Sequence, residues 1–274
     1  MRTTTVGAAL GRARALGLAR LDAQLLLAHA TGHDRAWVIA HDGDTLDGTA
    51  AGTFERLAAR RGAGEPLAYL VGAKEFHGLA LEVGPEVLVP RPETELLVEL
   101  ALSALRAAGP GSRAVDLGTG SGAIALALKA TLPEARLAAS DASAAALDRA
   151  RANGRRLGLD VDWRVGSWWE PWPGERFSVA VANPPYVAAD DPHLANLAHE
   201  PRAALVSGTE GLDAIRVIVA GSADHLLPEG WLWLEHGHDQ GERVRELLER
   251  ARYAAISTRL DLAGRPRCTG GRRL

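Results

Sequence analysis

A glycine-rich stretch in the middle of the chain has the residue types of a ligand-binding turn. In AVDLGTGSGAIALAL, residues 114–128, glycines alternate with Thr119 and Ser121 between two apolar runs. Glycine has no Cβ, so a ligand can approach the backbone of such a turn closely, and the first NH groups of the following helix are free to bind it. The glycines are Gly118, Gly120 and Gly122. We therefore expect residues 118–122 to bind a nucleotide-like ligand.

The glycine spacing alone leaves two ligands open. Gly118, Gly120 and Ala123 fit G-x-G-x-x-A, a fingerprint of dinucleotide binding, but the turn would equally suit S-adenosylmethionine. Asp141 follows Gly120 by about 20 residues, where a carboxylate accepts the ribose hydroxyls of either ligand, unless it only caps the next helix. Asp116, inside an apolar strand, suits the cationic amino or sulfonium group of S-adenosylmethionine better than a pyrophosphate.

Three tryptophans follow the third expected strand, in GSWWEPWPGERF at 166–177. The indole of Trp168 could stack on an adenine ring, with Trp169 and Trp172 as packing residues. The alternative is that all three only cover the edge of the sheet. Trp168 is therefore a candidate adenine-binding residue.

A second motif ends an apolar run in VANPPYVAA, at 181–189, with Asn183, Pro184, Pro185 and Tyr186. The Asn183 side-chain oxygen and the Pro184 carbonyl could each accept one hydrogen of an NH2 group and direct the nitrogen lone pair at a methyl carbon. The prolines would keep the backbone stiff, and Tyr186 would pack on the flat face of the substrate group. A rigid turn without chemistry is the alternative. Its place after the fourth strand of a sheet that also carries the glycine turn favours a binding site for an amino or amide group.

Both motifs require strands that end at one edge of a sheet. Continuous apolar runs alternate with helical patterns, which predicts an α/β fold with a doubly wound, mostly parallel sheet. We expect strands at 113–117, 136–140, 161–165, 177–182 and 231–235, and helices at 121–131, 143–157, 211–226 and 239–251. Residues 253–270 should add antiparallel strands at the edge of the sheet.

Three segments divide the chain. Residues 1–73 are rich in Ala, Leu and Arg, with leucines at helical spacing, and predict a small helical domain. Residues 74–92 contain KEFHGLALEVGPEVLVP, whose short alternating runs are broken by glycine and predict a β-hairpin linker. Residues 93–274 hold both motifs and form the α/β domain.

The amino-acid composition argues against several classes of partner and of binding site. The net charge of −3 argues against nucleic acid as the partner, and Cys268, the one cysteine, excludes an internal disulfide and a multi-cysteine metal site. No metal is expected, because the histidine pair His236 and His238 lacks a third ligand at a recognisable spacing. No run approaches the ~20 apolar residues that span a bilayer, so we expect a soluble protein without a membrane partner. We also expect the protein to be cytoplasmic and monomeric.

With these motifs the sequence resembles the release factor glutamine methyltransferase family almost end to end. Its linker and hairpin are similar to RRGAGEPLAYLVGAKEFHGLALEVGPEVLVPRPETE (60–95), its cofactor loop to DLGTGSGAIALAL (116–128), and its substrate clamp to NPPY (183–186). The segments HEPRAAL, GLDAIR, LLPEGWLWLEHGHDQGE and DLAGRPR also follow the family. NPPY is shared with DNA adenine methyltransferases, so PRPETE and the helical amino-terminal part are what narrow the resemblance.

The resemblance implies an S-adenosylmethionine-dependent methyltransferase with a Rossmann-like fold. It would methylate the side-chain amide nitrogen (N5) of the glutamine in the Gly-Gly-Gln motif of bacterial class I peptide chain release factors, with residues 1–73 as the docking domain. Residues 118–122, Asp141, Trp168 and Asn183 would bind the cofactor, and 183–186 the glutamine. Many relatives have an acidic residue that contacts the adenine amino group where this chain has Ser167.

Other interpretations of the two motifs remain open at this point. An amino methyltransferase acting on adenine or guanine in DNA or RNA would share the clamp, but it should show a basic face or an inserted recognition domain. A noncatalytic module could keep the cofactor fold as a scaffold. A nicotinamide oxidoreductase has no use for two carbonyls that hold an amino group. For methyl transfer we expect one in-line displacement, with no general base identified by the sequence.

Overall fold

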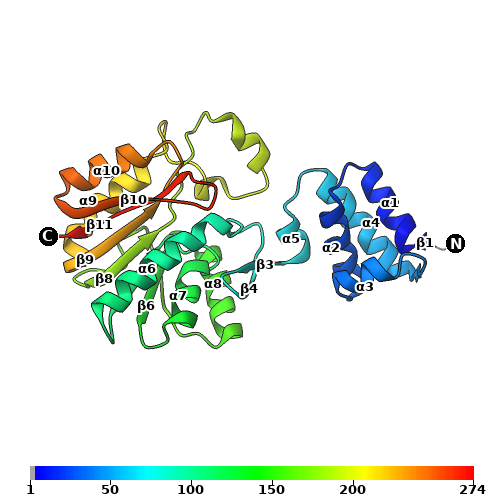
Figure 1. Cartoon of the computed structure of the whole chain (residues 1–274), viewed down its shortest axis with the longest axis horizontal. Coiled ribbons are helices and arrows are strands. Elements are labelled where there is room, and N and C mark those ends of the chain that lie inside the picture. The colour runs from blue at the N-terminus through cyan, green and yellow to red at the C-terminus, as the bar shows by residue number, and fades with distance from the viewer. Residues whose placement is uncertain (1–3) are drawn as a thin grey trace. The chain divides into compact units, whose positions relative to one another are not determined.

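The chain forms two compact units, Met1–Ala73 and Lys74–Leu274, in a computed structural model that describes residues 4–274 (Figure 1). Each unit has its own apolar core. The buried core residues of the first unit run from Val6 to Leu70, and those of the second from Phe76 to Cys268. Within residues 4–274, no helix is both long enough and apolar enough to cross a bilayer.

The first unit is helical, as its leucine spacing predicts. Its helices are α1 Val6–Ala15, α2 Arg20–Thr31, α3 Arg35–Ala40, α4 Gly48–Gly62 and α5 Leu67–Val71, with a short antiparallel pair β1 Thr4–Thr5 and β2 Thr45–Leu46. Asp34 and Asp47 cap α3 and α4, because their carboxylates accept hydrogen bonds from backbone NH groups of the first turn. Gly32 ends α2 in the left-handed conformation.

The expected hairpin consists of β3 Ala73–Phe76 and β4 Leu79–Glu82. Its two turn residues, His77 and Gly78, both have positive φ, as a tight hairpin with the twist of its strands requires. After it come the 3₁₀ turn η1 Pro92–Thr94 and the helix α6 Glu95–Ala108.

The second unit is built on a seven-stranded sheet with the order β10-β11-β9-β8-β5-β6-β7. The strands are β5 Arg113–Leu117, β6 Arg136–Asp141, β7 Asp162–Val165, β8 Phe177–Ala182, β9 Leu226–Glu235, β10 Tyr253–Leu260 and β11 Pro266–Arg273. The helices are α7 Ala123–Thr131, α8 Ala144–Leu157, α9 Asp213–His225 and α10 Gly241–Arg250. All pairs from β7 to β9 are parallel, which confirms the predicted doubly wound sheet.

Two details of the sheet differ from expectation. β9 begins at Leu226 rather than at 231, because a register shift against β8 accommodates the turn-like segment around Glu229, which has positive φ. The closing strands are antiparallel as expected, but β11 lies between β9 and β10, so of these two strands only β10 lies at an edge of the sheet, and β7 forms the other edge.

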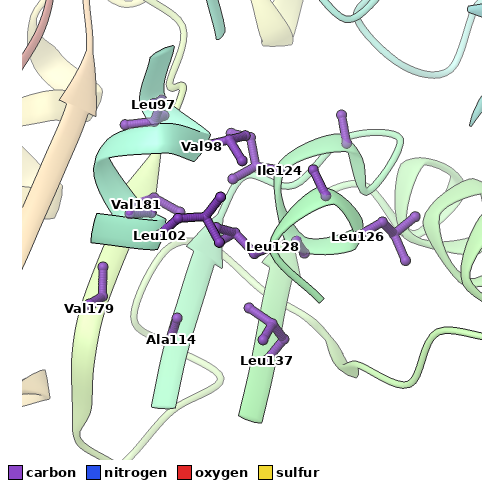
Figure 2. Close-up of a cluster of buried hydrophobic side chains, with 14 of the residues drawn as sticks. Leu97, Val98, Leu102, Ala114, Ile124, Leu126, Leu128, Leu137, Val179 and Val181 are labelled. Carbon is purple, nitrogen blue, oxygen red and sulfur yellow. The ribbon is translucent and has the colours of Figure 1, made fainter. Parts of the chain in front are cut away.

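The sheet is covered on both faces. Neighbouring residues of one strand point to opposite faces, and Ala114 belongs to one apolar cluster while Val115 belongs to the other. Figure 2 shows the first cluster, in which leucines and other apolar side chains of α6 and α7 meet Val179, Val181 and Leu137 of the sheet. The second cluster joins the sheet to α9 and α10. Burial on both faces fixes the register that aligns the strand ends.

Candidate active site

A cavity of about 290 Å³ lies where β5, β6 and β8 end, the position at which doubly wound folds bind their ligands. The parallel register sets Asp116 of β5 beside Ala139 of β6 and Val181 of β8, so the loops that follow these strands leave the sheet together. Among the predicted site residues, the cavity lining contains Gly118, Thr119, Gly120, Ser121, Asp141, Trp168 and Asn183, together with Pro185.

The glycine turn has the backbone that its sequence predicts. Gly118, Gly120 and Gly122 all have φ between +56° and +84°, a region that residues with a Cβ rarely adopt. A Cβ on Gly118 would also lie 3.1 Å from the Trp168 ring. The Gly120 NH donates to the Asp141 carboxylate at 2.8 Å, which ties the turn to the end of β6.

Asp141 is not the cap of α8, a role that Ser143 has, but it holds the loop before that helix. Its Oδ2 accepts from the Gly120 NH and its Oδ1 accepts from the Ser143 NH at the start of α8, while the residue also lines the cavity. Burial raises the pKa of Asp141, although these two hydrogen bonds oppose the shift. The carboxylate therefore holds both loops and faces the ligand space.

Asp116 lies beneath the glycine turn rather than in the cavity lining that residues 4–274 form. It is fully buried, and its Oδ2 accepts from the Thr119 hydroxyl at 2.6 Å and the Ala125 NH at 3.3 Å. Its Oδ1 has no hydrogen-bond donor among the described residues. Burial raises the pKa of Asp116 to about 7, against the effect of the Thr119 and Ala125 hydrogen bonds. A buried acceptor without a partner would favour a cationic donor close to the turn.

The three tryptophans lie in two different environments. Trp168 lines the cavity and is held with positive φ, its carbonyl accepting from the Ser140 hydroxyl at 3.1 Å. Trp169 and Trp172 are buried in the second apolar cluster, so they pack the fold. Ser167 also lines the cavity.

Two of the four NPPY residues, Asn183 and Pro185, line the cavity, whereas Pro184 and Tyr186 do not. The Asn183 Nδ2 donates to the Thr94 hydroxyl at 3.1 Å, and no other described hydrogen bond uses the Asn183 side chain, so its oxygen is free for a ligand. Pro184 is buried, whereas Asn183 and Pro185 line the cavity. Burial, followed by the charge of Glu235, raises the pKa of Tyr186 to about 12, so this phenol stays protonated.

Tyr186 is fixed from behind by two residues far away in the sequence. The Gln240 Nε2 donates to the Tyr186 carbonyl at 3.0 Å. Gly211, with φ of +71°, lies so close that a Cβ there would come within 2.1 Å of the same carbonyl oxygen. The NPPY turn therefore has little freedom to move away from the cavity.

Several cavity residues were not predicted as site residues. These are residues 86–91, Thr94, Ala123, Ile124, Ala142, Ser143, Ala146, Ser167, Pro201, Ala203 and Ala204. Buried Glu200 joins two of these segments, since its carboxylate accepts from the Val89 NH at 3.1 Å and forms an ion pair with Arg91. The only signal in the sequence was the resemblance of PRPETE and HEPRAAL to family segments, because neither stretch has a periodic pattern.

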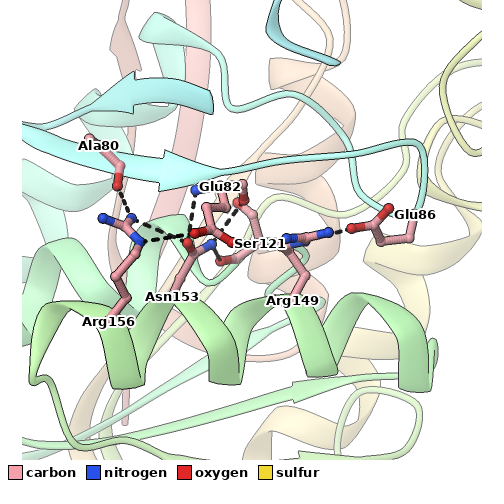
Figure 3. A network of polar contacts seen from close by, with 7 residues as sticks. All are labelled: Ala80, Glu82, Glu86, Ser121, Arg149, Asn153 and Arg156. Carbon is pink, nitrogen blue, oxygen red and sulfur yellow. Dashed lines mark hydrogen bonds and ion pairs between the residues drawn. The ribbon is translucent and has the colours of Figure 1, made fainter. Parts of the chain in front are cut away.

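The linker hairpin is fastened to the glycine turn through α8 (Figure 3). The Asn153 side chain accepts from the Glu82 NH and donates to the carbonyls of Glu82 and Ser121, each at 3.0 Å or less. Arg149 forms ion pairs with Glu82 and Glu86. These contacts hold the lining segment after β4 next to the turn at 118–122.

The histidine pair has an ordinary structural role. His236 is fully buried, with Nδ1 2.8 Å from the Gly237 carbonyl and Nε2 2.7 Å from the Thr269 hydroxyl. Burial lowers its pKa, which keeps the ring neutral. Within residues 4–274, no group of three or more His, Cys, Asp or Glu side chains is arranged to hold a metal ion.

Comparison with known proteins finds two family models that match different parts of the chain. The PrmC N-terminal domain family matches residues 7–72, and the Methyltransferase small domain family matches residues 93–255. Release factor glutamine methyltransferases of Bordetella pertussis and Burkholderia pseudomallei are 48% and 49% identical to this chain. The alignments cover 93% of this chain and 95% of the first protein, and 94% of both chains for the second.

The chain belongs to the release factor glutamine methyltransferase family. Among solved structures, a methyltransferase from Pyrococcus furiosus matches with a TM-score of 0.56 at 18% identity, covering 72% of this chain and 89% of that one. A likeness at this identity supports the fold alone. The family assignment therefore rests on the sequence relatives. Most of the cavity lining lies within residues 93–255, which match the methyltransferase domain, and residues 86–91 of the lining precede that match.

Proposed function

We propose that this chain transfers a methyl group from S-adenosylmethionine to the side-chain amide nitrogen of the glutamine in the Gly-Gly-Gln motif of class I peptide chain release factors. The observation that carries this proposal is the orientation of Asn183 at the cavity wall. Its nitrogen is bound to Thr94, so its oxygen, beside the carbonyl of Pro184, is available to accept from an NH2 group. A pair of acceptors selects glutamine against glutamate, whose carboxylate has no hydrogen to donate.

The residues around the cavity fit the proposed cofactor. The NH groups of the glycine turn and the Asp141 carboxylate would hold the polar parts of the nucleoside, with Trp168 against its ring. Asp116, buried beneath the turn, would favour the positive charge of the amino acid part from behind the glycine loop, since one of its carboxylate oxygens has no donor among the described residues. When bound, S-adenosylmethionine supplies an electrophilic methyl group.

The chain's own contribution is alignment of the target nitrogen. Two carbonyl oxygens that each accept one hydrogen of the NH2 group fix the orientation of that group. Its lone pair then points to one side. The prolines carry no NH, so no backbone donor at 184 or 185 competes for these acceptors. The buried, protonated Tyr186 does not act as a base, and we assign the final proton loss to water.

We further propose that the helical unit, residues 1–73, docks the release factor. It has a separate core, and it presents large apolar side chains to solvent, with Leu16, Leu21 and Ile39 all about half exposed. Exposed apolar side chains of this size are the kind of anchor that protein interfaces use.

Mass spectrometry of a purified release factor tests the proposed reaction. The factor is incubated with this protein and methyl-labelled S-adenosylmethionine, and the label is mapped to a residue. We expect one methyl group on the Gly-Gly-Gln glutamine and none on a factor whose glutamine is replaced by glutamate. Label in RNA or DNA and none in the factor would instead support a nucleobase as the substrate, which is the rival interpretation of NPPY.

Asp141→Ala is expected to weaken cofactor binding about 10- to 150-fold, since a hydrogen bond to a charged group contributes roughly 1.5–3 kcal/mol. Calorimetric titration with S-adenosylmethionine measures the effect. Asp148→Ala, which removes an exposed carboxylate of the neighbouring helix α8, is the matched control and should bind normally. Unchanged affinity of the Asp141 variant would mean that this carboxylate only joins the loops at Gly120 and Ser143.

Gly211→Ala is expected to lower kcat about tenfold, because a Cβ at this place would push on the Tyr186 carbonyl, and a misplacement of about 1 Å can cost up to ~100-fold in rate. Gly158→Ala is the matched control, since Gly158 has nearly the same φ, +68°, but open space around it. Both variants should lose about 1 kcal/mol of stability from the strained backbone, and Gly211→Ala should lose more because its Cβ also collides with the Tyr186 carbonyl. Equal kcat values for the two variants would show that the contact with Tyr186 is unimportant.

A further inference from the structure

Ser140 is a buried polar residue in the strand behind the cavity. It is the next to last residue of β6, is fully buried, and does not itself line the cavity that residues 4–274 form. It pairs with Leu117 of β5 and Arg164 of β7, so strands on both sides fix its backbone. Polar groups at such places are expected to have hydrogen-bond partners, and those of Ser140 lie in two different loops.

The Ser140 carbonyl holds the start of the glycine turn that follows β5. It accepts from the Gly118 NH at 2.8 Å and from the Thr119 NH at 3.0 Å. These two bonds use both lone pairs of the carbonyl oxygen. They involve backbone atoms alone, so a substitution of the Ser140 side chain leaves both of them in place.

The Ser140 hydroxyl holds the loop that follows β7, on the other side of β6. It donates to the Trp168 carbonyl at 3.1 Å. The carbonyls of Ser167 and Trp169, on either side of Trp168, accept from NH groups within the loop itself. Among residues 4–274, the Ser140 hydroxyl is the only described donor to the Trp168 carbonyl. The loop is therefore joined to β6 at the residue that lines the cavity.

Trp168 depends on this bond because its backbone is strained. Its φ is +47°, a left-handed conformation that a bulky residue with a Cβ rarely adopts. Such conformations persist only where surrounding contacts fix them, and they are concentrated at ligand sites. The free energy of one hydrogen bond is comparable with the free energy of such strain. Loss of the Ser140 hydroxyl would therefore let Trp168 relax to another conformation.

The ring of Trp168 lies against the glycine turn. A Cβ on Gly118 would be 3.1 Å from this ring, so the ring packs closely on the Gly118 backbone. Ser140 bonds both members of this contact, Gly118 through its carbonyl and Trp168 through its hydroxyl. The spacing between the ring and the turn is thereby fixed at the edge of the sheet where both line the cavity.

We propose that Ser140 is a positioning residue for cofactor binding, whose hydroxyl holds Trp168 in the conformation that places the indole against the nucleoside. The inference rests on the proposed function, in which Trp168 packs on the ring of S-adenosylmethionine. Ser140 acts through Trp168, since it is not among the described residues that line the cavity. Its effect should therefore appear in the affinity for the cofactor and not in the rate of methyl transfer.

Ser140→Ala removes the hydroxyl and keeps the carbonyl that bonds the glycine turn. The dissociation constant of S-adenosylmethionine, measured by calorimetric titration, should rise about 3- to 10-fold, the effect of losing one uncharged hydrogen bond. The KM for S-adenosylmethionine should rise by the same factor, while kcat at saturating cofactor stays within about twofold of the wild type. A dissociation constant equal to that of the wild type would refute the proposal.

A double-mutant cycle tests whether Ser140 acts through Trp168. Trp168→Ala removes the ring, so adding Ser140→Ala to this variant should change the dissociation constant by less than about twofold. If Ser140→Ala weakens binding by the same factor with and without the Trp168 ring, the hydroxyl does not act through that ring and the positioning role is wrong.

Ser222→Ala is the matched control for the loss of a buried hydroxyl. Ser222, in α9, is also fully buried, and its hydroxyl donates to the Val219 carbonyl and accepts from the Tyr253 hydroxyl, each at 2.6 Å. Both variants should lose stability, but only Ser140→Ala should lose affinity for S-adenosylmethionine. Equal losses of affinity would mean that the Ser140 hydroxyl serves the fold alone.

The indole NH signal of Trp168 provides a measurement without any ligand. It is assigned in nitrogen-15 NMR spectra by its absence from Trp168→Phe. In Ser140→Ala this signal should change position, whereas the signals of Trp37 in the helical unit and of Trp231 in β9, which is not adjacent to β6, should stay in place. An unchanged Trp168 signal would contradict the proposal. If the wild type binds no S-adenosylmethionine, the proposed function fails, and the indole signal still decides whether Ser140 positions Trp168.

Discussion

Asn183→Ala is expected to lower kcat by about 10²- to 10³-fold, the loss typical of removing one preorganised group that acts on the reacting atoms. The dissociation constant of S-adenosylmethionine should change by less than about threefold, because the lost oxygen matters chiefly while the target nitrogen is being aligned. Single-turnover methylation of a release factor gives the rate, and calorimetric titration gives the affinity.

Asn196→Ala is the control for this substitution. Asn196 lies in the following loop, in η2 Pro192–Leu197, and is exposed, so its loss should change neither quantity. A comparable loss of rate and cofactor affinity in the Asn183 variant would contradict the proposed clamp. It would mean that Asn183 serves mainly to bind the cofactor.

Deletion of residues 1–72 is expected to lower kcat/KM on an intact release factor about 100-fold, the equivalent of losing one or two interface anchors of roughly 2 kcal/mol each. Cofactor binding should survive. The core of the first unit uses residues up to Leu70, while the two clusters of the second unit begin at Phe76, so the deletion removes no residue from the sheet core.

A short peptide with the Gly-Gly-Gln sequence separates docking from chemistry. The truncated and full-length proteins should methylate this peptide at the same low rate, since neither reaction uses a docking contact. Far-UV circular dichroism checks that the truncated protein is folded. Full activity of the truncated protein on the intact factor would refute the docking role of the helical unit.

The strands that position the site were predictable because they are buried on both faces. The segments expected at 113–117 and 177–182 coincide with β5 and β8, since continuous apolar runs that stop at a glycine or an asparagine leave little choice of boundary. The start of β9 was missed because Pro228 and Gly230 have the sequence pattern of a turn. Only pairing with β8 makes that segment a strand.

The supporting contacts of the site could not be predicted in the same way. Thr94 and Asn183 are 89 positions apart, and nothing in the pattern around either residue indicates that they meet. Asp116 was expected to face a cationic ligand, but its place beneath the turn depends on the Thr119 hydroxyl and the Ala125 NH. Such contacts arise from the tertiary packing of loops, whose sequences have no periodic pattern from which contacts could be predicted.

The position of β11 between β9 and β10 has a consequence for how the protein folds. β10 precedes β11 in the chain, and β11 is the strand that pairs with β9. The backbone NH and CO groups along one side of β9 therefore stay unpaired until the hairpin at 253–273 has formed. Until then Trp231 and Trp233 lie on an apolar strand with one unpaired edge. Folding intermediates aggregate through edges of this kind. Gly270 lets β11 pass under the Trp233 ring, where a Cβ would meet the ring at 2.2 Å. A side chain at 270 should therefore slow the pairing of β11 with β9 and lower the yield of soluble protein.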